Sequence, residues 1–162
     1  MNQTTFLFLN NFAGKSALFD AGVVFFAQYF IFFFAIGVLI FCIRGKEEIF
    51  EKLFVMLGGA TAAWLVSQGI NELYPVARPF LVFPEIIRLF VHGGYDSFPS
   101  GHATFAAALA MGVFYHNRTL GRVFLFGSLL IGISRVVAGV HWPADIIAGL
   151  TLGVTGVFII YF

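Results

Sequence analysis

Charged side chains are scarce in this sequence. Only 10% of its 162 residues are Asp, Glu, Lys or Arg, whereas 60% are hydrophobic and 23 are phenylalanine. An average soluble domain carries roughly 25% charged residues. Because a water-soluble fold of this size cannot bury so much apolar surface, the composition excludes an ordinary soluble domain and indicates a chain embedded in a membrane.

Basic runs and cysteine pairs are also missing. Nine Lys and Arg residues balance eight Asp and Glu residues without forming a basic run, which excludes a nucleic-acid-binding protein. Cys42 is the only cysteine, so neither an internal disulfide nor a thiolate metal site is available. We expect Cys42 to be a small, buried hydrophobic residue.

Long apolar segments fill most of the chain. Two of them contain no Asp, Glu, Lys or Arg and reach the roughly 20 residues that a helix needs to cross a bilayer. Three further apolar stretches follow. The five segments are residues 21–43, 53–71, 101–115, 123–140 and 144–162. They predict an all-α, polytopic membrane helix bundle of about five transmembrane helices, in one domain that covers residues 1–162. The first segment is too long for a signal-peptide core, so we expect the mature protein to keep it.

Basic residues predict the orientation of these helices. They lie near span ends in the first and third loops, which is the bias expected of cytoplasmic loops. These residues are Arg44, Lys46, Lys52, Arg118 and Arg122. The second and fourth loops, with the N-terminus, then face the outside. We therefore expect a protein of the cell (inner) membrane whose active site faces the periplasm or the cell exterior.

Two arginines stand at span ends on this predicted outer face. An arginine at the centre of an apolar helix costs roughly 2.5 to 3.5 kcal/mol, so Arg135 needs a water-lined site or an anionic partner. Arg78 follows the second span. One guanidinium group can donate two parallel hydrogen bonds to a phosphate. Two arginines together therefore predict a phosphate rather than a carboxylate ligand.

The segment SFPSGHATFAAALA has the pattern of a helix start, with Ser100 as N-cap and with Gly101 and His102 in the first turn. The free amides and partial positive charge of such a helix start could hold a phosphate on Ser100 and Gly101, with His102 beside it. An ordinary cap and an interfacial histidine explain this segment alone equally well.

His141 lies four residues before Asp145 in SRVVAGVHWPADIIAGL. A carboxylate at this spacing can fix the free ring nitrogen and stabilise the imidazolium, which makes an oriented nucleophile or base. Taken alone, the spacing is weak, because a histidine held by a nearby helix-capping carboxylate is the commoner situation.

Taken in order, R-P at Arg78, P-S-G-H at residues 99–102 and S-R-x5-H-x3-D at residues 134–145 resemble the three signature motifs of the type-2 phosphatidic acid phosphatase superfamily. The second and third motifs match at every fixed position. The family's first motif is K-x6-R-P, and Asn71 stands at the lysine position. This difference removes one positive charge from the expected phosphate site, so that either Asn71 donates a neutral hydrogen bond or the phosphate preference has changed.

The resemblance implies a role for each matched residue. His141 would attack phosphorus to form a phosphohistidine, Asp145 would orient His141, and His102 would protonate the leaving oxygen and then activate water. The phosphate-binding residues would be Arg78, Ser100, Gly101 and Arg135, with Asn71 in the place of the lysine. No metal ion and no cofactor are implied.

Residues outside the motifs indicate a substrate. The opening SALFDAGVVFFAQY, Phe80 and the pair Ser97 and Phe98 resemble bacterial undecaprenyl-diphosphate phosphatases, enzymes of peptidoglycan biosynthesis. We therefore expect undecaprenyl diphosphate as the lipid phosphate substrate, with phosphatidate, phosphatidylglycerophosphate and lipid A phosphates as alternatives. Family members usually have six spans, and one N-terminal helix is expected to be absent here.

Two other classes remain as alternatives: a catalytically inactive lipid-phosphate binder or transporter, and a structural membrane protein whose polar groups line a cavity. Vanadium-dependent haloperoxidases share these motifs but are soluble. The long loop at residues 72–100, which includes His92, receives no role from spacing alone. Oligomeric state is not predicted.

Overall fold

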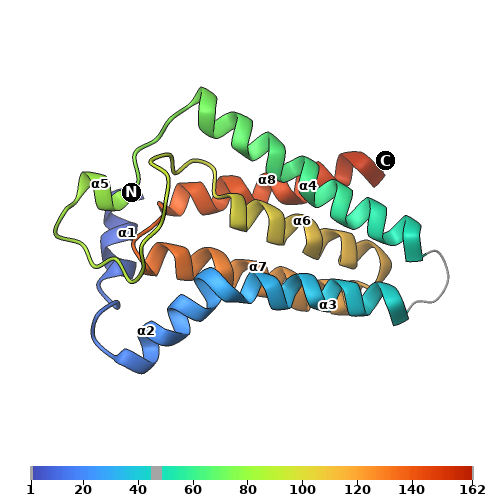
Figure 1. Cartoon of the computed structure of the whole chain (residues 1–162), viewed down its shortest axis with the longest axis horizontal. Coiled ribbons are helices and arrows are strands. Elements are labelled where there is room, and N and C mark those ends of the chain that lie inside the picture. Colours follow the sequence, from blue (N-terminus) through green and yellow to red (C-terminus); the bar gives the residue numbers. More distant parts are fainter. Residues whose placement is uncertain (1, 45–48, 162) are drawn as a thin grey trace.

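The computed structural model describes residues 2–44 and 49–161, and it confirms an all-α bundle in which long helices run side by side (Figure 1). No strand occurs among the described residues. The helices are α1 (Asn2–Asn10), α2 (Ala17–Val24), the π-helical turn η1 (Phe25–Tyr29), α3 (Phe30–Arg44), α4 (Ile49–Leu73), α5 (Pro79–Val82), α6 (Gly101–His116), α7 (Arg118–Val137) and α8 (Pro143–Tyr161). Helix α2, η1 and α3 form one continuous segment.

Each predicted apolar segment is helical over nearly all of its described residues, although the fourth ends in the turn after α7. Three helical segments, Ala17–Arg44, Glu51–Leu73 and Arg118–Val137, are long and apolar enough to cross a membrane. The apolar part of α8, Pro143–Ile159, is shorter, and α6 has 16 residues. The helical bundle is therefore confirmed, whereas five crossings stay a prediction.

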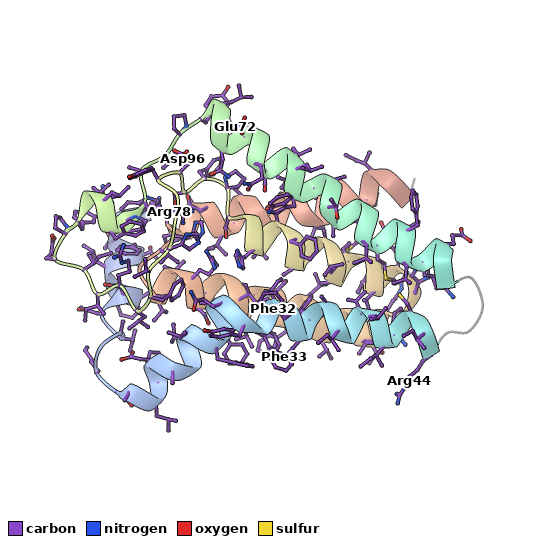
Figure 2. All side chains as sticks on the ribbon, viewed as in Figure 1. Phe32, Phe33, Arg44, Glu72, Arg78 and Asp96 are labelled. Carbon is purple, nitrogen blue, oxygen red and sulfur yellow. The ribbon has the colours of Figure 1, made fainter. Side chains whose placement is uncertain are left out.

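Many apolar side chains of these helices point outward. Phe32 and Phe33 on α3 are 63% and 57% exposed (Figure 2). A bilayer solvates such groups as readily as a protein core does, so exposed phenylalanines need no protein partner there. Cys42, by contrast, is fully buried in the apolar core, as predicted.

Helix α1 was not predicted. Nine residues make a helix of about 14 Å, which is too short to cross a bilayer. It packs against α7 and α8 at the end of the bundle that carries the long loop (Figure 1). The Asn10 side chain donates hydrogen bonds to the carbonyls of Ile87 (2.7 Å) and Val137 (2.9 Å). Helix α1 thereby ties the long loop to the end of α7.

Helix α6 packs against α4, α7 and α8 through a surface of small side chains. Five alanines of α6 are fully buried: Ala103, Ala106, Ala107, Ala108 and Ala110. Opposite them, a Cβ on Gly149 of α8 would lie 2.7 Å from the Ser100 carbonyl oxygen, and one on Gly153 would collide with the Thr104 carbonyl oxygen. The backbones of α6 and α8 are therefore in direct contact, as small residues allow.

The loops that carry the predicted motifs meet at one end of the bundle (Figure 1). The Ser97 amide donates to the Val76 carbonyl (2.8 Å), and the Leu89 amide donates to the Ala138 carbonyl (3.2 Å). Arg44 lies at the opposite end (Figure 2), as does the connection from α6 to α7. Lys46, which also served to predict the orientation, lies outside the described residues, as does residue 162 of the last predicted segment.

The contact between α6 and α8 predicts a selective response to added methyl groups. Gly153→Ala should destabilise the fold by roughly 1 to 3 kcal/mol, because the new methyl group meets backbone that cannot move away independently. Gly58→Ala on α4 is the matched control, since a Cβ there has no neighbour within 4 Å. Thermal unfolding in detergent should show a lower Tm for the first variant only. Equal Tm values would contradict the backbone contact.

Candidate active site

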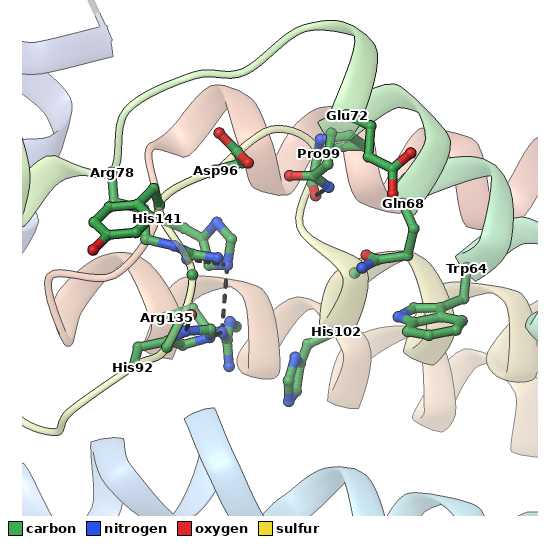
Figure 3. Close-up of a pocket in the computed structure, with 15 residues that line it drawn as sticks. Trp64, Gln68, Glu72, Arg78, His92, Asp96, Pro99, His102, Arg135 and His141 are labelled. Atoms are coloured by element: carbon green, nitrogen blue, oxygen red, sulfur yellow. Dashed lines mark hydrogen bonds between the residues drawn. The ribbon is translucent and has the colours of Figure 1, made fainter.

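His141 lies in the turn between α7 and α8, and it is buried with 3% exposure. Its Nδ1 is 3.3 Å from Asp145 Oδ2. Its Nε2 is 3.2 Å from Arg78 Nη1 and 3.3 Å from Arg135 Nη2 (Figure 3). A carboxylate beside Nδ1 favours a proton on that atom, which leaves a lone pair on Nε2. Both guanidinium groups therefore converge on the ring nitrogen that can act as a nucleophile.

The protonation of His141 fits this arrangement. Burial lowers its pKa well below the ordinary value, and the charges of Arg135 and Arg78 lower it further. The imidazole is therefore neutral at pH 7. A neutral ring is required for attack, because a protonated Nε2 has no lone pair.

Asp145 is held by three donors. It lies in the first turn of α8, where the helix dipole favours a negative charge. Its Oδ2 accepts hydrogen bonds from the Trp142 amide (2.8 Å) and from the Ser97 hydroxyl, besides facing His141. Its backbone carbonyl accepts from the Ser100 amide (3.1 Å). Asp145 thereby joins the start of α8 to the start of α6 and to the long loop.

The two arginines are anchored by backbone carbonyls. Arg78 Nη1 donates to the Val140 carbonyl (2.8 Å), and Arg135 Nη1 donates to the Ala27 carbonyl in η1 (2.9 Å). Arg135 is only 1% exposed. The Nε atoms of both arginines are buried without a hydrogen-bond partner. Buried donors without a partner are rare in folded proteins, and here both belong to the arginines that line the cavity.

A cavity of about 410 Å³ opens beside these groups (Figure 3). Six of the predicted site residues line it: Asn71, Arg78, Gly101, His102, Arg135 and His141. Ser100 and Asp145 are buried and are not among the residues that line the cavity. The structure therefore gathers the predicted residues around one cavity, although residues 71 and 145 are far apart in the chain.

Two details differ from the sequence-based expectation. The Ser100 amide, expected to be free, is occupied by the Asp145 carbonyl. Ser100 keeps a buried hydroxyl oxygen without a partner, and Gly101 is close-packed, since a Cβ there would lie 3.0 Å from Trp64 Nε1. Asn71 donates to the carbonyls of Ser67 (3.0 Å) and Pro99 (3.2 Å). Both hydrogens of the Asn71 amide are therefore bonded to backbone carbonyls, and neither is left to donate to a phosphate.

Sequence reasoning assigned no role to His92, which the long loop folds into the cavity. Its Nε2 is 2.5 Å from Arg135 Nη2, and its ring centroid is 6.1 Å from that of His141. Burial lowers the pKa of His92 to about 4, with a further contribution from Arg135. The ring is therefore neutral and accepts a hydrogen bond from the arginine. No sequence pattern predicts a role for a lone histidine in a loop. The position of His92 depends on how α1 and α7 hold that loop.

The family follows from comparison with known proteins. Residues 49–162 match the model of the PAP2 superfamily. The chain belongs to the PAP2 superfamily. Since this is a family of membrane lipid phosphatases, the chain is an integral membrane protein and a phosphoric ester hydrolase. The resemblance of its three motifs to the type-2 phosphatidic acid phosphatases is thereby confirmed.

Relatives of the chain cover nearly all of it. The "Undecaprenyl-diphosphatase BcrC" of Bacillus subtilis (strain 168) is 28% identical over 156 residues, which are 95% of this chain and 79% of that protein. The "Bacitracin transport permease protein BcrC" of Bacillus licheniformis is 27% identical over 165 residues, which are 99% of this chain and 79% of that protein. The solved structure of Aquifex aeolicus LpxE has a TM-score of 0.82 at 23% identity and covers 99% of this chain and 95% of its own, so it shares the fold.

Ser97 offers a test of the site geometry. Its hydroxyl donates to the Asp145 carboxylate, and a hydrogen bond to a charged group contributes about 1.5 to 3 kcal/mol. Ser97→Ala should therefore lower kcat for phosphate release by about 10- to 100-fold. Ser128→Ala is the matched control, because that buried hydroxyl bonds only to the Leu125 carbonyl of its own helix. Equal activities, with unchanged Tm values, would show that Ser97 does not support Asp145.

Proposed function

We propose that this protein removes the terminal phosphate of undecaprenyl diphosphate through a phosphohistidine on His141. The observation that carries the proposal is the convergence of Arg78 and Arg135 on Nε2 of a neutral His141 whose Nδ1 faces Asp145. The choice of substrate is supported by a relative named undecaprenyl-diphosphatase that matches 95% of the chain.

In the first step, Nε2 of His141 attacks the terminal phosphorus, and the bond between that phosphorus and the bridging oxygen breaks. Arg78 and Arg135 stabilise the charge on the phosphoryl oxygens, and Asp145 stabilises the imidazolium. His102 donates a proton to the leaving oxygen of undecaprenyl phosphate. The bound anion favours the protonated form of His102 that this step requires.

In the second step, His102 takes a proton from water, and the water oxygen attacks the phosphorus of the phosphohistidine. The bond between phosphorus and Nε2 breaks, inorganic phosphate leaves, and His141 returns to its neutral form. Splitting hydrolysis into covalent formation and breakdown needs one nucleophile and one separate acid and base, which the two histidines provide.

A lipid substrate is supported by an apolar groove beside the cavity at His141. That cavity is called the phosphate cavity below. The groove has a volume of about 360 Å³, and Trp64, Gly101 and His102 line both the groove and the cavity. Ile31 of α3, Trp64 of α4 and Phe105 of α6 supply its apolar walls. A substrate chain can therefore lie among apolar side chains while its phosphates stay in the polar cavity.

We also propose that the site lies on the outer face of the cell (inner) membrane, toward the periplasm or the exterior. The motif loops gather at one end of the bundle, and the basic residue Arg44 stands at the other (Figure 2). Basic residues near span ends favour the cytoplasmic side.

The proposal is tested by phosphate release from undecaprenyl diphosphate, phosphatidate, phosphatidylglycerophosphate and lipid A, with EDTA present. Detergent-purified protein should favour the diphosphate and stay active in EDTA, because no step uses a metal ion. His141→Ala should lower kcat by several orders of magnitude at an unchanged Tm. A preference for another lipid would replace the proposed substrate. Binding of lipid phosphates without release by either protein would identify a binder instead.

The covalent intermediate makes a separate prediction. Wild-type protein mixed with diphosphate labelled at the terminal phosphate, and stopped within one turnover, should carry a label that acid removes and alkali does not, as expected of a phosphorus–nitrogen bond. His141→Ala should carry none. A labelled His141→Ala protein would rule out His141 as the nucleophile.

A further inference from the structure

A second hollow adjoins the phosphate cavity on the side of η1. It has a volume of about 290 Å³. Its lining residues are Gln28, Tyr29, Phe90, His92, His102 and Arg135. We propose that this hollow binds the second phosphate of a diphosphate substrate, the phosphate that stays on the lipid. The proposal rests on the function proposed above and names the part of the site that distinguishes a diphosphate from a monophosphate.

Three residues are shared by the phosphate cavity and the second hollow. His92, His102 and Arg135 line both the phosphate cavity and the second hollow. A residue that protonates the bridging oxygen has to stand between the two phosphates. His102 fits this position, since it lines both spaces and its side chain extends from α6 toward the blue helix (Figure 3). With the terminal phosphate at His141, the other phosphate falls in the second hollow.

The π-helical turn η1 also supports a phosphate site in the second hollow. In η1 the Phe30 amide reaches back five residues to the Phe25 carbonyl, and the Ala27 carbonyl of this turn accepts from Arg135 Nη1 at 2.9 Å. Turns of this kind are frequent at functional sites. The next two residues, Gln28 and Tyr29, line the hollow, and their side chains end in an amide and a phenol. One turn thus anchors the arginine and also contributes two residues with neutral donor groups to the lining of the hollow.

The charge of a diphosphate substrate also supports this site. A diphosphate ester has more negative charge than a monophosphate ester and needs more donors. Arg135 borders both spaces and brings a positive charge to each of them. Asn71 stands where the family has a lysine, and both hydrogens of its amide bond to backbone carbonyls. Asn71 therefore supplies no additional donor, whereas Gln28, Tyr29 and Arg135 line the hollow proposed for the second phosphate.

The test compares farnesyl diphosphate with farnesyl monophosphate, because the two share one apolar chain. The variant Gln28→Leu with Tyr29→Phe removes both donors and keeps the side-chain volumes. The ratio of kcat/KM for the diphosphate to kcat/KM for the monophosphate should fall by about tenfold or more. Thr155→Val is the matched control, because this exposed hydroxyl of α8 bonds only to carbonyls of its own helix, and its ratio should equal that of the wild type.

Inhibition gives a second readout that does not depend on turnover of a diphosphate. With farnesyl monophosphate as substrate, the inhibition constant of methylene diphosphonate should rise about tenfold in the double variant, whereas that of inorganic phosphate should change by less than about twofold. A variant that is merely misfolded would lose both.

An unchanged ratio, or an equal loss on both substrates, overturns the second-phosphate site while the proposed phosphatase reaction stands. Hydrolysis of the monophosphate alone by the wild-type protein overturns both the proposed substrate and this inference. Phosphate release that persists in His141→Ala overturns the proposed nucleophile. The ratio of the two kcat/KM values in the Gln28→Leu, Tyr29→Phe variant then still decides whether the second hollow binds a phosphate.

Discussion

The direct backbone contact between α6 and α8 is the constraint on which the rest of the site depends. Gly149 and Gly153 let α8 approach α6 so closely that no Cβ fits between them. At the end of this contact the Ser100 amide donates to the Asp145 carbonyl. Because the starts of the two helices are fixed to each other, His102 on one and His141 before the other face a common cavity.

Burial of two arginines beside His141 is the main cost of this arrangement. Arg135 is almost fully buried, and no carboxylate lies within ion-pair distance of it among the described residues. Carbonyls take the place of a carboxylate: Ala27 in η1 for Arg135 and Val140 for Arg78. Carbonyls hold a guanidinium without neutralising it, so the positive charge stays available to an anion. A carboxylate partner would compete with the phosphate.

Asp145, the carboxylate that faces His141, lies behind the imidazole ring. Asp145 is held by the Trp142 amide and the Ser97 hydroxyl, and it is not among the residues that line the cavity. Glu72 and Asp96 line the cavity itself, whereas a carboxylate behind Nδ1 can stabilise the charge that develops on the ring. The apolar groove and the hollow at η1 both meet this cavity at His102.

The amino-acid sequence by itself determined the helical membrane class, the family and six of the residues around the cavity, because apolar length and fixed motif spacing are local properties. Tertiary structure alone decided the rest. Helix α1 is too short to appear as a span, the π-helical turn has no distinguishing composition, and the occupied Ser100 and Asn71 amides depend on partners distant in the chain. His92 reaches Arg135 only because Asn10 and Ala138 hold its loop. Such contacts arise from packing between segments, which no local pattern encodes.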